Sequence, residues 1–433
     1  MENLDYARLQ MAFTLGFHII FACIGMVMPF FMVVSHYKWL KTRKAVYLKL
    51  TKAWVKGVAI FFVIGAVSGT ALSFELGMLW PEFMKHAGPI IGMPFSLEGA
   101  AFFVEAIALG FYLYGWDRLP ERFHWYTGII IGISGVASGI LVVSANGWMN
   151  APSGFEYVDG KFINIDPVGA LFNPAWFTQA LHMTLAAFVA TSFGVAGIHA
   201  FQVFRGRNVE LHKKAFKIAL VFGAVAAFLQ PLSGDLSAKD VAERQPVKLA
   251  ALEAHYETGR GVPLYIGGIV DEGNRSVSHK IEIPKALSFL AFGDFDAEVK
   301  GLNDFPEDEL PPVAIVHYAF QAMVGIGSLL MLAGLVFFIS LKRKKWQESN
   351  KYWLLFVTMA PLGFLAIEAG WIVTEVGRQP WIIHQIMRTK DAVTPMPGMK
   401  YSFFFYVFLY TILALTVVWL MHRQIKTLNK PEN

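Results

Sequence analysis

The sequence predicts an all-α polytopic membrane protein with nine transmembrane helices, an outer N-terminus and a cytoplasmic C-terminus. Of the 433 residues, 55% are hydrophobic and only 16% are charged, whereas a soluble protein carries about 25% charged residues. Apolar runs of about 20 residues, long enough to cross a bilayer, recur along the whole chain. Lysine and arginine gather in alternate connections between these runs, which sets the orientation of the spans.

Nine apolar runs predict the positions of the spans. They cover about 9–35, 54–80, 95–116, 124–145, 176–204, 214–232, 313–341, 352–376 and 401–422. We therefore divide the chain into helices 1–6 (1–232), an extracytoplasmic loop (233–312) and helices 7–9 (313–433). The loop has mixed charge and strand-like pieces such as VPLYIGGIV. Loops of this length are often functional.

The connections differ in charge in a way that fixes the topology. The first and seventh connections contain basic clusters such as KTRK at 41–44 and LKRKK at 341–345, whereas 81–94 contains only Lys85. The positive-inside rule places the basic connections in the cytoplasm. The net charge of +5 is thereby explained by topology, and no nucleic-acid partner is expected. The opening residues MENLDYARLQ lack a basic region, so we expect no cleavable signal.

Polar side chains within the predicted spans share one depth, in the outer half of the membrane. Taken singly, a histidine there is more often a partner in helix packing, and a methionine is more often a packing residue. Ionisable groups inside a membrane are nevertheless costly and are candidates for function. A whole set at one level lines an ion path or surrounds cofactors. The set comprises His18, Glu75, Glu98, Glu105, His182, Met323, Glu368 and Glu375.

The composition limits which cofactors are possible. Cys23 is the only cysteine and no CxxCH motif occurs, which excludes covalently attached heme and iron–sulfur clusters. Non-covalent heme b held by histidine and methionine needs no further motif. The 38 phenylalanines and 12 tryptophans suit the faces of large flat rings.

Several motifs together carry a family resemblance over essentially the whole chain. These are RLQMAFTLGFH (8–18), GWDRLP (115–120), NGWM (146–149), KLAALEAHYET (248–258) and GRQPW (377–381). With them the chain resembles subunit I of the cytochrome bd-type quinol oxidases. The resemblance implies nine spans, with a quinol-binding loop on the outer side between spans six and seven. It also implies a heme-bearing subunit that oxidises quinol at the outer face and reduces O2 to water with cytoplasmic protons.

The resemblance assigns heme ligands residue by residue. His182 and Met323 match the axial pair of a low-spin heme b. His18 and Glu375 match the ligands of two high-spin hemes, which are b and d, or b in both sites. Which of His18 and Glu375 serves the oxygen-binding heme stays open.

Further roles follow from the same resemblance. Lys248 and Glu253 match loop residues implicated in quinol oxidation. Glu98, Glu105 and Ser138 match a proton-delivery route, while Arg378 and Trp371 match residues that flank the hemes. Glu368 is assigned only a structural hydrogen bond or a contact with the heme environment.

Two departures from many relatives bear on the cofactors. Gln321 stands where many members carry arginine, and losing that charge should make the low-spin heme easier to oxidise. The outer loop is also the short version. Both leave open whether the oxygen site holds heme d or b.

The expected partners are a second oxidase subunit, a possible small single-span subunit, menaquinol or ubiquinol, O2 and membrane lipid. The expected location is a bacterial or archaeal cytoplasmic membrane. Two alternatives are a heme-b electron-transfer subunit without oxygen chemistry and a proton-coupled transporter.

Overall fold

The computed structural model describes residues 3–429, and most of them are helical. The helices are α1 (Asn3–Thr42), α2 (Ala45–Leu79), α3 (Pro81–Tyr114), α4 (Glu121–Asn150), α5 (Pro167–Leu171), α6 (Trp176–Phe204), α7 (Val209–Arg244), α8 (Pro246–Leu252), α9 (Ala286–Phe292), α10 (Val313–Lys342), α11 (Asn350–Met359), α12 (Leu362–Val376), α13 (Thr389–Ala392) and α14 (Met399–Leu428). Within the described residues nine helices are long and apolar enough to cross a membrane, with α11 and α12 counted as one crossing. The predicted all-α class with nine spans is therefore confirmed, and the orientation of the termini stays a prediction.

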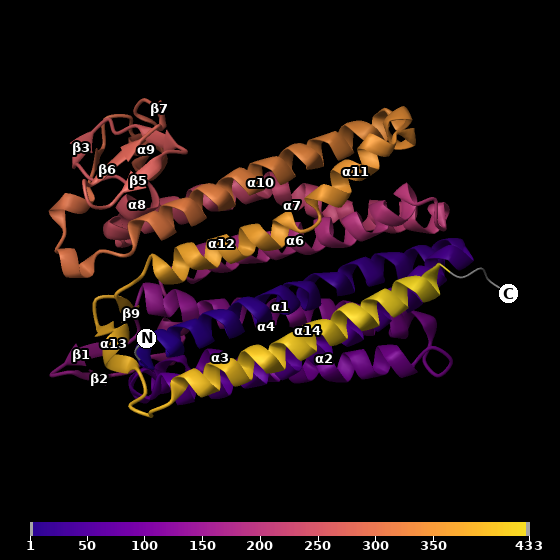
Figure 1. Ribbon diagram of the computed structural model, residues 1–433. Coiled ribbons are helices and arrows are strands. Elements are labelled where there is room, and N and C mark those ends of the chain that lie inside the picture. The colour runs from indigo at the N-terminus through magenta and orange to yellow at the C-terminus, as the bar shows by residue number, and fades with distance from the viewer. Residues whose placement is uncertain (1–2, 430–433) are drawn as a thin grey trace.

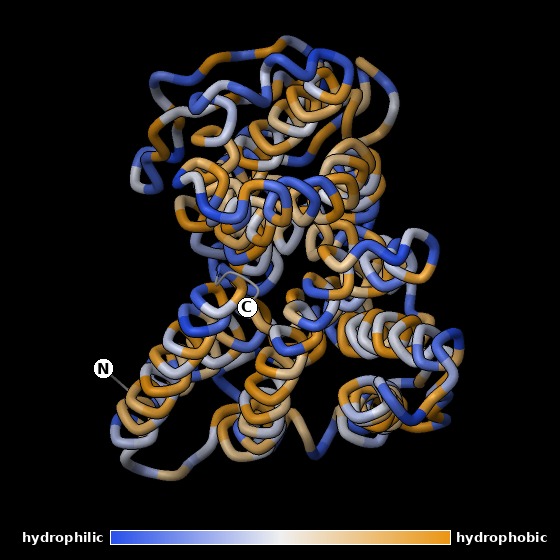
Figure 2. Tube along the Cα trace, turned by 90° about the vertical axis from the view of Figure 1, so that its right-hand side faces the viewer, coloured by the Kyte–Doolittle hydropathy of each residue, from blue (hydrophilic) through white to orange (hydrophobic). Residues whose placement is uncertain are grey.

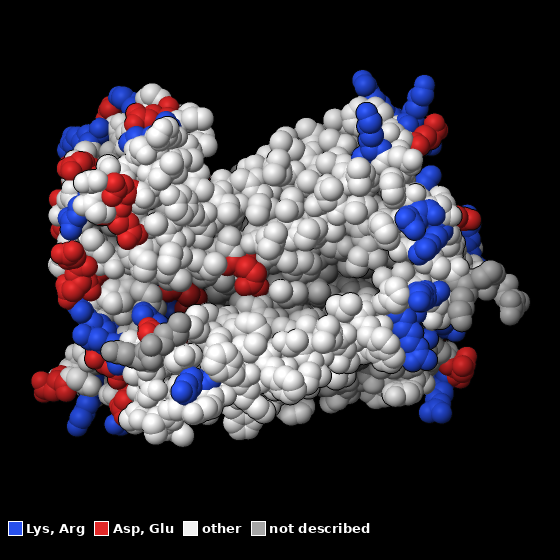
Figure 3. Space-filling model, viewed as in Figure 1, with Lys and Arg blue, Asp and Glu red and all other residues white. Residues whose placement is uncertain are grey.

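The long helices pack as two groups that run side by side (Figure 1). One group contains α1, α2, α3, α4 and α14, and the other contains α6, α7, α10, α11 and α12. The two groups are joined where α6 packs against α1 and α4. Figure 3 shows the surface hollowed between them, with red acidic side chains in the otherwise white middle of the molecule.

The two ends of the bundle differ in charge and structure. Lysine and arginine crowd the end where α1 leads to α2 and where α14 ends, while the small strands and short helices lie at the other end (Figures 1 and 3). Viewed from the first of these ends, Figure 2 shows hydrophobic helices joined by hydrophilic turns. The N- and C-terminal ends of the described chain lie at opposite ends of the bundle.

Most helices extend beyond the predicted spans, and one predicted span is broken. Helix α3 begins at Pro81, although the span was predicted from 95 with 81–94 as a connection, and it contains Pro89 and Pro94. Prolines are tolerated inside membrane helices when neighbouring groups satisfy the freed backbone. Helix α7 continues past 232 to Arg244. The crossing predicted at 352–376 is broken between α11 and α12, where Pro361 lacks an N–H.

The segment between α7 and α10 is a small structured cap with little regular sheet. Its strands are β3 (Gly259–Arg260), β4 (Leu264–Ile266), β5 (Ile269–Asp271), β6 (Ser276–Ser278), β7 (Ile281–Ile283) and β8 (Glu298–Val299), paired β3–β8, β4–β7 and β5–β6. Elsewhere β1 (Glu156–Val158) pairs with β2 (Lys161–Ile163), and β9 (Trp381–Ile383) pairs with β10 (Met387–Arg388). The strands β4 and β5 fall within the predicted strand-like piece VPLYIGGIV. Each strand pair of the cap is only two or three residues long.

Side chains of α10 hold this cap to the bundle. Gln321 donates from Nε2 to the carbonyl of Tyr265 at 2.9 Å, and its Oε1 accepts from the Gly267 N–H at 3.2 Å. The hydroxyl of Tyr318 accepts from the Val270 N–H at 3.0 Å. Gln321, two positions before Met323, therefore fastens the connection between β4 and β5 to α10.

Close helix packing depends on glycines where α6 meets α11 and α12. A Cβ placed on Gly363 of α12 would lie 2.5 Å from the Cα of Ala190, and one on Gly197 of α6 would lie 2.3 Å from the Cβ of Ala360. Real side chains do not approach this closely, so the two helices touch backbone to backbone. Such small-residue contacts are the usual means by which membrane helices come together.

We expect Gly363→Ala to lower the free energy of unfolding in detergent by about 1–3 kcal/mol, because the added methyl group forces α12 away from α6. The matched control is Gly110→Ala on α3, where nothing lies within 4 Å of the added Cβ. Alanine is the better helix former, so the control should be neutral or slightly stabilising. Thermal unfolding measures both. Equal midpoints for the two variants would contradict the packing argument.

Candidate functional site

His18 on α1 is held by a serine of the neighbouring helix. Its Nδ1 lies 2.9 Å from the hydroxyl of Ser68 on α2, and that hydroxyl donates its own proton to the carbonyl of Ile64 at 2.8 Å. The serine oxygen must therefore accept from Nδ1–H of the imidazole. In this tautomer Nε2 carries the lone pair that a metal ion needs. Gly69 of α2 faces the ring, and a Cβ placed on this glycine would lie 3.0 Å from Cε1 of His18.

His182 on α6 has the same arrangement with a serine of α7. Its Nδ1 lies 3.0 Å from the hydroxyl of Ser233, which donates to the carbonyl of Gln230 at 2.9 Å. The amide of Gln230, which can only donate from Nε2, lies 3.1 Å from Nε2 of His182. Nε2 is therefore again the unprotonated nitrogen.

Met323 on α10 lies against α12 at a position that carries no side chain. Its sulfur would be 3.1 Å from a Cβ placed on Gly370. The other predicted low-spin ligand, His182, also faces a glycine. A Cβ placed on Gly234 of α7 would lie 3.6 Å from its Cε1. Both predicted ligands thus lie against glycines of a neighbouring helix, where a larger residue would crowd Met323 most closely.

Glu375 lies in the last turn of α12 and both of its oxygens accept hydrogen bonds. Oε1 accepts from Nδ2 of Asn146 on α4 at 2.5 Å, and Oε2 accepts from Nη2 of Arg378 at 2.6 Å. Arg378 is only 3% exposed, and its Nε and Nη1 have no partner among the described residues. A buried guanidinium with unused N–H groups is a site prepared for a further anion.

Lys248 and Glu253 lie on and beside α8, at the base of the cap, and both are buried. Nζ of Lys248 donates to Oδ1 of Asn150 at 2.7 Å. Burial, and next the charge of Arg378, lower the pKa of Lys248 to about 7. Burial raises the pKa of Glu253 to about 8, and its Oε2 has no partner within the part of the chain that is described. At neutral pH Glu253 is therefore mainly protonated.

Three of the predicted residues lie along the contact of α3 with α4. The hydroxyl of Ser138 on α4 donates to Oε1 of Glu98 on α3 at 3.0 Å. Glu105 lies seven residues further along α3, a distance of about 10 Å on a helix. It is 6% exposed, and its Oε2 is 3.4 Å from a Cβ built on Gly135. The structure thus aligns Glu98, Ser138 and Glu105 at one helix interface.

Other buried groups in the bundle lack partners among the described residues. Nε1 of Trp371 and Oε1 of Glu368, both on α12, are two of them. Oε2 of Glu368 occupies the space that a side chain on Gly16 of α1 would fill, at 2.9 Å from a built Cβ. Glu75 is fully buried. Its Oε1 accepts from Gln10 and Thr14, each at 3.1 Å, while its Oε2 is unpaired.

These observations fit the residues to iron porphyrins. In the described chain no three His, Cys, Asp or Glu side chains converge as a bare metal ion would require. Histidines whose Nε2 carries the lone pair, and a buried arginine with N–H groups unpaired among the described residues, are what a ring with propionates needs. The two histidine tautomers and Arg378 Nε and Nη1 are therefore consistent with heme.

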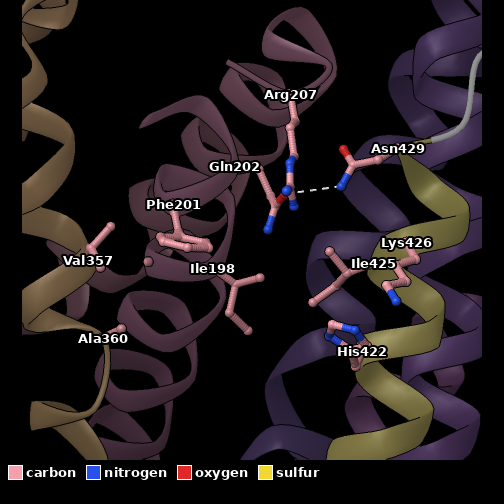
Figure 4. Close-up of a pocket in the computed structure, with 11 residues that line it drawn as sticks. Ile198, Phe201, Gln202, Arg207, Val357, Ala360, His422, Ile425, Lys426 and Asn429 are labelled. Atoms are coloured by element: carbon pink, nitrogen blue, oxygen red, sulfur yellow. Dashed lines mark hydrogen bonds between the residues drawn. The ribbon is translucent and has the colours of Figure 1, made fainter. Parts of the chain in front are cut away.

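A separate cavity of about 520 Å³ lies at the lysine-rich end, between α6, the α11–α12 break and α14 (Figure 4). Ile198, Phe201 and Ile425 are among its apolar lining residues. At its end Nδ2 of Asn429 donates to Oε1 of Gln202 at 3.0 Å. None of the predicted site residues lines it.

Sequence reasoning missed the partners that hold the predicted residues. Ser68 and Ser233 gave no signal, because serine is common in membrane helices. Asn146 stands in the NGWM motif, and Asn150 follows one residue after that motif, yet neither was assigned a role. The only available signal was that both amides lie near the outer end of a predicted span.

Comparisons with known proteins identify the family of this chain. The family model of cytochrome bd terminal oxidase subunit I matches residues 6–429. A putative cytochrome bd menaquinol oxidase subunit I of Bacillus subtilis is 38% identical, over 97% of this chain and 96% of that protein. A cytochrome bd ubiquinol oxidase subunit 1 of the same organism is 32% identical, over 98% of this chain and 94% of that protein.

The fold is also that of a solved relative. The structure of bd oxidase from Geobacillus thermodenitrificans matches with a TM-score of 0.93 and 38% identity, covering 98% of this chain and 99% of that one. Nine spans, the outer motifs and these matches lead to one conclusion. The chain belongs to the cytochrome bd terminal oxidase subunit I family and is a subunit of a bd-type quinol oxidase.

Proposed function

We propose that this chain is the subunit that binds the hemes, oxidises quinol at the outer face and reduces O2 to water with cytoplasmic protons. The observation that carries the proposal is the pair of histidines, His18 and His182. Each gives its Nδ1–H to a serine hydroxyl and so keeps the lone pair on Nε2, the atom that would bind iron; at His182 this lone pair accepts from Gln230, which a bound iron would displace.

The charge distribution supports an orientation for the reaction. We place the lysine- and arginine-rich end in the cytoplasm, which puts the N-terminus and the cap outside. Lys248, Glu253, Glu375 and Arg378 then lie near the outer face. Quinol protons would leave directly to the outside, and protons for water would cross most of the membrane.

The proposed ligands fall into two classes. His182 and Met323 would hold a low-spin heme b, while His18 and Glu375 would each hold a high-spin heme, b and d or b in both sites. When bound, these hemes supply one-electron transfer and an open iron position at which O2 is reduced. Arg378 would donate its free N–H groups to a propionate, and Trp371 would lie beside the rings.

Quinol oxidation requires a group that accepts the proton of the quinol hydroxyl. Glu253 is suited to this role, because its unpaired Oε2 is buried next to the cap and its pKa lies near the working range. Lys248 would carry positive charge at the same place. We assign quinol binding to the region of α8.

Proton delivery toward the oxygen site would use the acids of α3. Glu105 and Glu98 lie on one face of that helix, and Ser138 hydrogen-bonds Glu98 from α4. A proton arriving from the cytoplasmic side would reach Glu105 first and then the Glu98–Ser138 pair. Buried carboxyl groups can hold and pass protons without leaving a permanent charge in the membrane.

The expected partners follow from the family and from the exposed surface. Helix α14 presents an apolar face that includes Phe404, Phe408 and Trp419, which a partner subunit or lipid would cover. We propose a second oxidase subunit and a small single-span subunit, in a bacterial or archaeal cytoplasmic membrane. The relatives named above include a menaquinol and a ubiquinol oxidase, so either quinol is proposed.

We expect His182→Ala and Met323→Ala each to abolish the low-spin heme b bands in a reduced-minus-oxidised spectrum, because each removes one axial ligand. The high-spin bands should remain. His279→Ala, on an exposed part of the cap, is the matched control and should keep all bands. Unchanged low-spin bands in both ligand variants would refute the assignment. A parent protein with low-spin heme alone would favour the electron-transfer alternative, and one without heme would favour a transporter.

We expect Glu105→Gln and Glu98→Gln to slow O2 reduction by about tenfold or more, because amides cannot pass a proton. Reduction of the hemes by quinol should be much less affected. Oxygen-consumption assays with stopped-flow heme spectra separate the two steps. The control is Glu82→Gln, an exposed acid at the start of the same helix that pairs with Lys85. Full turnover in both buried variants would rule out this route.

We expect quinol oxidation to accelerate as the pH rises through about 8, because burial raises the pKa of Glu253 to that value and only its ionised form accepts a proton. Glu253→Gln should lose this rising limb and turn over about 100-fold more slowly. Glu257→Gln alters an exposed neighbour that binds Asn303 and should retain the profile. A parental pH profile in Glu253→Gln would exclude it as the base.

A further inference from the structure

A continuous series of side-chain hydrogen bonds connects the base of the cap with Glu375. Nζ of Lys248 donates to Oδ1 of Asn150 at 2.7 Å. Nδ2 of Asn150 donates to Oδ1 of Asn146 at 3.1 Å, and Nδ2 of Asn146 donates to Oε1 of Glu375 at 2.5 Å. The series therefore joins three elements, α8, α4 and α12, that are far apart in the sequence.

The chemistry of the two ends fixes the direction of the series. A lysine ammonium can only donate, and an ionised carboxylate can only accept. Asn150 must therefore turn its oxygen to Lys248, and Asn146 must turn its nitrogen to Glu375. Every amide dipole then points the same way, from the cation to the anion, so each bond strengthens the next.

Burial indicates that the series is a built part of the protein. Lys248 is 5% exposed and Asn150 is 3% exposed. The backbone of Asn150 is held as well, because Nε2 of Gln245 donates to its carbonyl at 2.7 Å. The turn after α12 is tied to the same helix end by His384, whose N–H donates to the carbonyl of Met149 at 3.0 Å. The ammonium of Lys248 thus faces the protein interior.

We propose that Asn146 and Asn150 are positioning residues that couple Lys248 to Glu375, and that Lys248 acts on the high-spin heme site through them. This inference rests on the proposed function, in which Glu375 is a heme ligand. Asn146 donates to Oε1 of Glu375 and Arg378 donates to Oε2. The carboxylate is therefore fixed from both sides, and its remaining lone pairs are oriented toward the proposed iron. The hydrogen bonds also pass part of the positive charge of Lys248 to Glu375. This makes the carboxylate a weaker electron donor to iron, which favours the reduced iron over the oxidised iron.

The decisive variant is Asn146→Asp, which keeps the size of the side chain but replaces the donor with a second carboxylate beside Glu375. We expect the high-spin bands to shift, the midpoint potential of that heme to fall, and turnover to drop about tenfold or more. Asn150→Leu and Lys248→Met should change the same bands less, since they act at one and two steps further away. Lys248→Arg keeps the cation and should restore the parental spectrum.

Two controls separate positioning from general damage. The low-spin bands of the same samples should stay unchanged, because His182 and Met323 lie on other helices. Asn164→Asp makes the same substitution at an exposed asparagine that also donates to a glutamate, Glu156, at 2.9 Å, and it should leave all bands unchanged. The whole oxidase is used, and the quinol KM is measured for each variant.

The outcomes distinguish this inference from the ligand assignment on which it rests. If Glu375→Ala removes the high-spin bands but Asn146→Asp has parental bands and potential, the coupling is wrong and the ligand stands. If Lys248→Met raises the quinol KM while the high-spin spectrum stays parental, Lys248 acts on quinol directly and the coupling is also wrong. High-spin bands that persist in Glu375→Ala would overturn both.

Discussion

The arrangement of this protein depends on one constraint, which is that polar groups inside a membrane must find partners on neighbouring helices. The bundle meets it with pairs that cross between helices, such as His18 with Ser68 and His182 with Ser233. These contacts satisfy the polar atoms and at the same time orient them. Among the described residues, two nitrogens of Arg378 and Nε1 of Trp371 are left without a partner, in the region where we propose that the hemes bind.

Much of the fold could be predicted from the sequence, because span length and hydropathy are imposed by the bilayer itself. The nine crossings were predicted for that reason. Helix ends outside the hydrocarbon layer obey no such rule. The start of α3 at Pro81 and the extension of α7 to Arg244 depend on packing against the cap and the neighbouring helices. From the sequence alone, a charged or proline-containing segment cannot be distinguished from a loop until that packing is known.

The candidate site could be predicted at the level of depth and residue type only. His18, His182 and Glu375 stand out because ionisable side chains at one level are unusual in a membrane, whereas the family resemblance is what distinguishes Met323 among 17 methionines. Their partners could not be found in this way. Asn146 and Glu375 are separated by 229 positions, and nothing local to either one indicates which of the other polar residues will meet it.

Under the proposed function, the same geometry would place quinol and oxygen chemistry at one end of the molecule. The cap is tied by Gln321 to α10 just before Met323, and Lys248 at its base is hydrogen-bonded toward Glu375. Electrons from a quinol at the cap would therefore enter both proposed heme regions from this end. Protons for water would take the long path, along which α3 carries Glu105 and Glu98. Charge separation would then follow from where the groups stand in the membrane, without a moving pump element.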